Sequence, residues 1–206
     1  MKRFLSILLA LALALTLGIP ALAAEHRAGD TYIRILGSSG ARTVGVRTTY
    51  GAYRQTADGA VYRDDRYEFV YTDDGVSWVS AGAAESSLGS GMYDGTQFLA
   101  GPFGSERPTW CSADGGHWTA LTPEEQDTAP AIQRGRSSLN GLTFTLRGGR
   151  ELWVTDGQGR AVELTADFTS FLASYDMADV QAYPVPQGIR VAVSYTHLTL
   201  PTNREV

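Results

Sequence analysis

The sequence predicts an all-β protein built from repeated units, and three observations support that prediction. Most of the chain consists of short aromatic and β-branched runs, such as "RYEFVY" at residues 66–71, separated by Gly, Asp and Asn. Runs with helical periodicity are nearly absent, and residues 165–180 are the best candidate for one short helix or an aromatic loop. Asp73, Asp114 and Asp156 each follow such a run, at intervals of 41 and 42 residues. A repeat of about 40 residues holding about four short strands is typical of β-propeller blades.

The N-terminal segment has the pattern of a secretory signal peptide. Residues 1–23 begin with Lys2 and Arg3, continue with an apolar run and end in the cleavage motif Ala21-Leu22-Ala23. The alternative is a transmembrane anchor, but the apolar run is short for a span and Pro20 interrupts it. We therefore expect cleavage after Ala23, an extracellular mature protein, and no membrane contact after cleavage.

The C-terminal segment differs from the rest of the chain. Residues 193–206, "VSYTHLTLPTNREV", do not continue the repeat and resemble a translated sequencing-library adapter. We interpret them as a non-native tail. Residues 24–192 are then the natural part of the chain, and the repeat period allows three to four blades of an incomplete propeller.

Charge and ligand-forming residues limit the partners. Residues 24–192 carry 14 arginines and 21 acidic residues, a net charge of −7, which argues against nucleic acid as a partner. Cys111 is the only cysteine, and His26 and His117 do not form a zinc pattern with it. We expect no metal and no cofactor, and the oligomeric state stays open.

A second element recurs with the aspartates. A polar residue followed by glycine opens a strand at Asp94-Gly95 and at Asn140-Gly141, with further copies at Asp58-Gly59 and Gln187-Gly188. Two interleaved elements that recur together favour a true repeat over chance.

The turns of the repeat resemble the Asp box of bacterial neuraminidase-repeat propellers, whose pattern is Ser-x-Asp-x-Gly-x-x-Trp. The first copy is "YTDDGVSW" at residues 71–78, the second is "SADGGHW" at residues 112–118, and the third keeps an aspartate and nearby glycines. The residues that carry this resemblance are Asp73, Gly75, Trp78, Ser112, Asp114, Gly116, Trp118 and Asp156. A short Asp side chain can accept backbone N–H groups across a tight turn, glycine supplies positive φ, and tryptophan packs against the turn. These residues are therefore expected to be structural, and the resemblance implies that they lie away from any active centre.

The same resemblance raises an alternative, a sialidase-like glycoside hydrolase. In sialidases an Arg-Ile-Pro motif precedes the first Asp box, and its arginine grips the substrate carboxylate. Here Arg34 is the matching arginine, but Leu36 replaces the proline. The resemblance implies an aspartate as the acid, and the candidates downstream are Asp58, Asp64 and Asp65.

The favoured interpretation is a secreted, non-catalytic bacterial β-propeller that acts as a binding or scaffold module for a glycan or an extracellular protein. The loops of successive blades gather on one face of a propeller, where a partner usually binds. Candidate sugar-stacking side chains are Tyr50, Tyr53, Tyr62, Phe103 and Tyr183. The alternative is the sialidase-like hydrolase described above.

Overall fold

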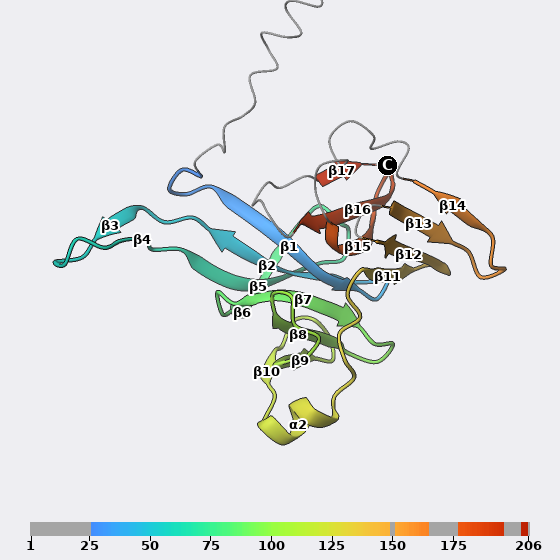
Figure 1. Ribbon diagram of the computed structural model, residues 1–206, viewed down its shortest axis with the longest axis horizontal. Helices are drawn as coiled ribbons and strands as arrows, with labels where there is room; N and C mark the ends of the chain where they lie inside the picture. The colour runs from blue at the N-terminus through green and yellow to red at the C-terminus, as the bar shows by residue number, and fades with distance from the viewer. Residues whose placement is uncertain (1–25, 149–150, 165–176, 196–202, 206) are drawn as a thin grey trace, which may run out of the picture.

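The computed structural model describes residues 26–148, 151–164, 177–195 and 203–205. It confirms the predicted all-β class, because antiparallel sheets dominate these ranges (Figure 1). The helical part of the described chain is short, and none of it is long and apolar enough to cross a bilayer. The predicted signal peptide, residues 1–23, lies outside the described residues.

Four sheets follow one another along the chain, and within each sheet the strands lie side by side in chain order. Sheet 1 contains β1 (Thr31–Ser38), β2 (Thr43–Thr49), β5 (Arg66–Thr72) and β6 (Val79–Ala83). Sheet 2 contains β7 (Leu88–Tyr93), β8 (Phe98–Pro102), β9 (Trp110–Ser112) and β10 (Thr119–Ala120). Sheet 3 contains β11 (Arg136–Leu139), β12 (Leu142–Arg147), β13 (Glu151–Thr155) and β14 (Ala161–Glu163). Sheet 4 contains β15 (Met177–Val185), β16 (Gly188–Tyr195) and β17 (Asn203–Glu205).

A separate hairpin, here called the arm, is inserted between β2 and β5. It consists of β3 (Tyr53–Gln55) and β4 (Val61–Arg63), which pair only with each other. Almost all of its side chains are exposed, and Figure 1 shows it projecting from the body of the protein. Because it buries so little apolar surface, its stability depends on the strands from which it extends.

The first strands of the four sheets meet at the centre of the molecule. β1 contacts both β7 and β15, and β15 contacts β11. A side chain on Gly89 would meet Arg34, and one on Gly91 would meet Leu36, so β1 and β7 run in the same direction. β11 and β15 also run in the same direction, since Gly135 N–H bonds to Asp179 and Ala182 N–H bonds to Ser137.

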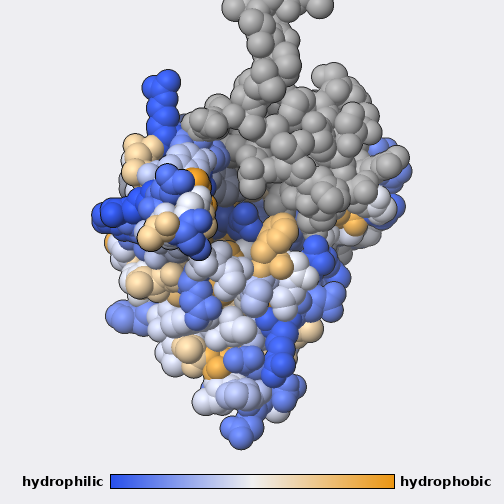
Figure 2. Space-filling model, turned by 60° about the vertical axis from the view of Figure 1, so that its left-hand side comes forward, coloured by the Kyte–Doolittle hydropathy of each residue, from blue (hydrophilic) through white to orange (hydrophobic). Residues whose placement is uncertain are grey.

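Two apolar clusters fill the space between the sheets. The first joins sheets 1 and 2 around Phe69 and Phe98, and the second joins sheets 3 and 4 around Phe144 and Val180. Strands near the centre are buried on both faces: Ile35–Ser38 and Thr43–Val46 are unbroken runs of buried residues. Figure 2 shows that hydrophilic residues cover most of the described surface on one face, and that hydrophobic residues appear there in separate small patches.

The acidic segment at residues 124–127 lies in the helix α2 (Pro123–Thr128), which begins with a capping box between Thr122 and Glu125. Two segments singled out in the sequence are described only in part. The candidate helix at residues 165–180 lies outside the described residues except for its last four, which begin β15. Part of the expected tail is described as strand, because residues 193–195 end β16 and residues 203–205 form β17.

Candidate functional site

The first aspartate turn joins β5 to β6 and is held by Asp74. The carboxylate of Asp74 accepts the backbone N–H groups of Val76 (2.8 Å) and Ser77 (2.7 Å). The buried Thr72 hydroxyl accepts the N–H of Gly75 at 2.9 Å and donates to Asp74. These bonds hold the pKa of Asp74 far below its ordinary value. The turn therefore uses Thr72 and Asp74 where the sequence pattern pointed to Tyr71 and Asp73.

The second aspartate turn joins β9 to β10 with the same bonds. Asp114 accepts the N–H groups of Gly116 and His117, and Ser112 accepts the N–H of Gly115. Its hydroxyl residue, aspartate, positive-φ glycine and tryptophan each lie 40 residues after their counterparts in the first turn. The two copies therefore have identical spacing. The positive-φ glycine is Gly115 rather than Gly116.

The third aspartate turn joins β13 to β14 and is looser. Asp156 accepts the N–H groups of Gln158 and Arg160, and its carboxylate pairs with the Arg160 guanidinium at 2.6 Å. The turn has no tryptophan, and a side chain added at Gly157 or Gly159 would meet nothing within 4 Å.

The two complete turns fasten neighbouring sheets together. The Trp118 ring of sheet 2 stacks on Phe69 of sheet 1, with centroids 4.2 Å apart, and its indole N–H donates to Gly115. The Trp78 ring of sheet 1 packs edge-on against Tyr183 of sheet 4 at 6.5 Å. These contacts make the turns clasps between sheets as well as within their hairpins.

The turn glycines also lie against the neighbouring sheet. Gly75 and Gly115 both have φ of +73°, which favours glycine. A Cβ on Gly75 would lie 2.2 Å from the Pro184 carbonyl oxygen, and one on Gly115 would lie 2.6 Å from Val44. Any side chain at either position would therefore push two sheets apart.

Arg42, in the β1–β2 turn, connects the two complete turns. Its guanidinium binds both carboxylate oxygens of Asp73 at 2.6 and 2.7 Å, and donates to the Asp114 carbonyl at 2.8 Å. It also lies over the Tyr71 ring at 4.1 Å. The hydrogen bond with Arg42 lowers the pKa of Asp73. Asp73 is thus part of an ion pair beside the turn.

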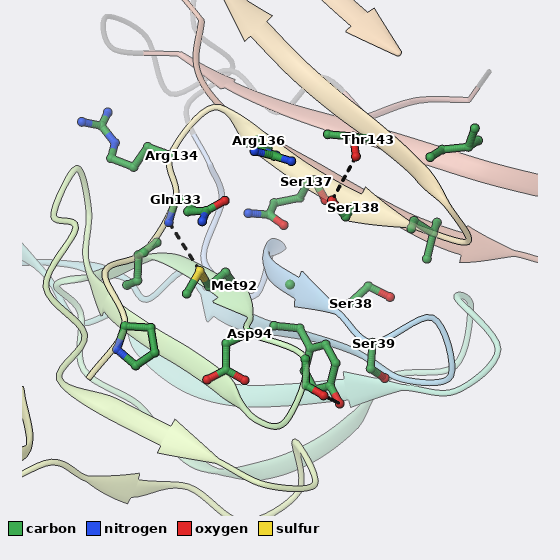
Figure 3. A pocket seen from close by; sticks show the side chains of 18 of the residues that line it. Ser38, Ser39, Met92, Asp94, Gln133, Arg134, Arg136, Ser137, Ser138 and Thr143 are labelled. Atoms are coloured by element: carbon green, nitrogen blue, oxygen red, sulfur yellow. Dashed lines mark hydrogen bonds between the residues drawn. The ribbon is translucent and has the colours of Figure 1, made fainter. Parts of the chain in front are cut away.

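A polar hollow of about 1020 Å³ lies where β7 and β11 are held apart (Figure 3). Its lining comes mainly from the ends of β1 and β7, from β11 and the start of β12, from Gln181 in the middle of β15, and from the chain that leads from sheet 2 into β11. This is the junction between sheets 2 and 3, where the third turn has no tryptophan. The hollow therefore occupies a junction at which the described residues form no tryptophan clasp.

The back of the hollow is formed by β15. The Gln181 side chain reaches from sheet 4 to sheet 2 and donates to the Gly91 carbonyl at 3.1 Å, in a buried position. On the other side of Gln181, the buried Ser137 hydroxyl accepts the Ala182 N–H at 3.0 Å. The long Gln181 side chain thus acts as a spacer between β7 and the pair β11 and β15.

The two walls of the hollow differ in chemistry. Sheet 3 and its lead-in segment contribute Gln133, Arg134 and Arg136, and the β7–β8 turn contributes Asp94 (Figure 3). Asn140 and Glu106 also line the hollow, and the Glu106 carbonyl accepts the Ile132 N–H of the lead-in segment. Gln133 is fixed because its backbone N–H donates to the Met92 sulfur at 3.4 Å.

The four catalytic candidates do not line this hollow. Arg34 lies on β1 with its guanidinium 4.7 Å from the centre of the Phe103 ring. Asp58 bonds to the Thr56 hydroxyl at the tip of the arm, and Asp64 pairs with Arg54 at 3.3 Å. Asp65 pairs with Arg63 at 2.7 Å and accepts the Gly51 N–H. Each aspartate therefore has a local structural partner.

The aromatic candidates fall into two groups. Tyr53, Tyr62 and Phe103 are exposed, by 60%, 49% and 44% respectively. Tyr50 is covered by His26, whose ring stacks on it at 3.9 Å, and by the Arg63 guanidinium at 4.3 Å. Tyr183 is 2% exposed and packs between sheets, so it is not available to a sugar.

The described residues give little basis for metal binding or for a reactive thiol. They contain no group of three or more His, Cys, Asp or Glu side chains placed to hold a metal ion. Cys111 is a half-buried free thiol whose pKa is raised by burial and by Glu125, so it stays protonated at neutral pH.

Sequence reasoning did not identify the hollow. Its residues come from segments more than 100 positions apart, Gly37 to Gln181. The recurring Asp94-Gly95 and Asn140-Gly141 turns do line it, but their spacing predicted a repeat and not a site. No protein-family model, curated protein or solved structure matches the chain.

Proposed function

We propose that the protein is a secreted, non-catalytic binding module whose four sheets are blades of a small β-propeller, and that the hollow holds a saccharide. The observation that carries this proposal is the hollow itself. Its volume, about 1020 Å³, lies near the upper end of the usual range for small-ligand pockets, and hydroxyl, amide and charged groups line it.

The propeller assignment has three supports. The first strand of each sheet lies at the centre, and the first strands of sheets 1 and 2, and of sheets 3 and 4, run in the same direction. Each aspartate turn joins the third and fourth strands of its sheet. The turn of sheet 2 packs on sheet 1, and the turn of sheet 1 packs on sheet 4. This order of contacts fits blades around an axis, with the aspartate turns as Asp boxes.

The non-catalytic assignment follows from the positions of the candidate acids. Asp58, Asp64 and Asp65 are held by neighbours on or beside the arm, and none lines the hollow. Neither Arg34 nor these aspartates meet a second candidate across a cavity, as a glycosidase pair would.

The test uses the full chain on a panel of immobilised saccharides, with variants that block the hollow. Ser138 is exposed on β11 and lines the hollow, so Ser138→Trp should fill it and abolish binding. Thr119→Trp on β10 is the matched control, since Thr119 is equally an exposed strand hydroxyl outside the hollow, and binding should persist.

A fluorogenic sialoside should not be hydrolysed by the same protein. Turnover that disappears in Arg34→Ala with the fold intact would replace this proposal with the hydrolase alternative. Equal saccharide binding by the Ser138→Trp and Thr119→Trp variants would show that the hollow is not the site.

A further inference from the structure

We infer that the ligand of the hollow carries an oxoanion group, a carboxylate or a sulfate, and that this group binds Arg136 on the wall that Gln133 and Asn140 also line. The inference rests on the proposed function, because it names the chemical class of the saccharide bound at the same site. It specifies that the saccharide is acidic and that it binds in a defined orientation.

The wall contributed by sheet 3 is rich in unused hydrogen-bond donors. Among the described residues, the side chains of Gln133, Arg136 and Asn140 have no hydrogen-bond or ion-pair partner, and together they present one guanidinium and two amides. Arg134 extends away from the other labelled side chains at the rim of the hollow, and it too has no ion pair within the described ranges (Figure 3). A guanidinium offers N–H donors in a planar fork, which matches the two oxygens of a carboxylate or sulfate.

The backbone holds these donors in place. Ile132 is buried and its N–H donates to the Glu106 carbonyl at 2.7 Å, while the next residue bonds to Met92. At the other end of β11, Asn140 adopts a φ of +50° in the turn that leads to β12. The donors therefore belong to a segment that is anchored at both ends, which lowers the ordering cost of binding.

The opposite wall carries the acidic residue Asp94, whose carboxylate is already used in hydrogen bonds within its own turn. The Asp94 carboxylate already accepts the N–H groups of Thr96 and Gln97 and the Thr96 hydroxyl. Burial opposes ionisation of Asp94, but these hydrogen bonds hold its pKa below the ordinary value, so it is charged at neutral pH. Glu106 is exposed and also lines the hollow, but it lies beside the lead-in segment, because its carbonyl accepts the Ile132 N–H. An acidic ligand is repelled by Asp94 and attracted to Arg136, so these two charges orient it.

Charge at the site contrasts with charge over the whole chain. The protein carries a net charge of −5, which disfavours acidic ligands at most of its surface. The arginines of the hollow are an exception, because no described carboxylate forms an ion pair with Arg136, and Arg134 interacts with the buried Asp179 only at longer range. Loss of a charged hydrogen bond to the ligand is expected to weaken binding roughly tenfold to a hundredfold.

The experiment compares matched acidic and neutral sugars on the full chain by isothermal titration calorimetry. The probes are digalacturonate, its neutral counterpart galactobiose, the same disaccharide carrying one sulfate, and tri-glutamate as an acidic peptide. We expect the two acidic saccharides to bind, galactobiose to bind more weakly by about tenfold or more, and added salt to weaken the acidic ligands selectively.

Variants connect the preference to the wall. Arg136→Gln should remove the preference for digalacturonate over galactobiose, while Arg54→Gln should keep it, since Arg54 is an exposed arginine on the arm. Glu106→Gln should strengthen binding of both acidic sugars, because it removes the opposing charge.

Each outcome separates this inference from the proposed function. If galactobiose and digalacturonate bound equally well and Ser138→Trp blocked both, the ligand would need no oxoanion group. The hollow would still be a saccharide site. Binding of tri-glutamate alone would replace the saccharide with an acidic peptide. An acidic preference that persists in Arg136→Gln would overturn the assigned wall.

Discussion

At the scale of single residues, the first aspartate turn shows that a shift of one position along the chain changes what an aspartate does. Asp73 and Asp74 are adjacent and identical in type, yet one pairs with Arg42 and the other holds the turn. The difference follows from direction, because successive side chains near a strand end point to opposite sides.

We predict that Asp74→Asn destabilises the protein more than Asp73→Asn does. Asp74 accepts two backbone N–H groups and one hydroxyl, whereas Asp73 makes an exposed ion pair, a class of interaction worth at most about 1 kcal/mol. Urea denaturation at neutral pH measures both variants. A larger loss in Asp73→Asn would mean that the Arg42 bridge, rather than the turn, holds the two sheets.

The low pKa of Asp74 also sets the direction of the pH dependence. The folded-state pKa lies below the unfolded value of about 3.9, so its contribution is fully present above that value and is lost as pH falls through the folded pKa. The stability gap between the wild type and Asp74→Asn should therefore narrow as the pH is lowered from about 4. A gap that stays constant down to the acid transition would exclude Asp74 as its source.

We predict the opposite pH dependence for Asp179. Burial raises its pKa, although its carboxylate accepts the N–H groups of Gly135 and Val180. A raised folded-state pKa gives a contribution that is present below the unfolded pKa and is lost as pH rises through the folded pKa. Asp179→Asn should therefore be at least as stable as the wild type at neutral pH and should lose that advantage in acid. Thermal melts across the pH range test this, and a variant less stable than the wild type at neutral pH would contradict it.

At the scale of elements, the turns between the third and fourth strands decide how the sheets associate. A turn with tryptophan and a positive-φ glycine packs on the neighbouring sheet, as both complete copies do. The third copy keeps its aspartate but has neither contact. The same local bonding can thus occur with or without a clasp between sheets.

We predict that Trp118→Ala destabilises the junction of sheets 1 and 2. The Trp118 ring stacks on Phe69 and is partly buried, so its loss should cost roughly 2–3 kcal/mol, somewhat less than for a fully buried tryptophan. Hydrogen exchange should rise in β5 more than in β12. Trp118→Phe keeps an aromatic ring and should recover part of the stability, whereas an unchanged exchange rate in β5 would rule out a clasp between the sheets.

At the scale of the whole molecule, the hollow depends on the separation of β7 from β11, which Gln181 maintains. We predict that Gln181→Leu keeps the fold at a cost of about 1–2 kcal/mol, the value of one lost hydrogen bond and an altered contact, and weakens ligand binding. Gln126→Leu is the matched control, since Gln126 also donates to a backbone carbonyl, on α2 and away from the hollow. If the two variants bound ligand equally well, Gln181 would not shape the site.

The sequence alone determined the fold class and the local turns. Alternating β-branched and aromatic runs with Gly and Asp between them define strands and hairpins, because these signals act over a few neighbouring residues. The equal spacing of hydroxyl residue, aspartate, glycine and tryptophan was also present in the sequence, since Thr72 to Trp78 matches Ser112 to Trp118, 40 residues later. That register becomes visible once threonine is accepted in place of serine.

The tertiary structure decided which surfaces meet and where the site lies. The hollow joins residues from four sheets, and Gln181 reaches Gly91 across 90 positions of chain. The burial of Tyr183 could not be predicted from the sequence either. An aromatic residue in a strand can be exposed or buried, and only the structure shows that Tyr183 packs against Trp78. Local patterns specify how a strand or turn forms, but contacts between sheets depend on the sum of many weak packing interactions, and only the folded chain brings those partners together.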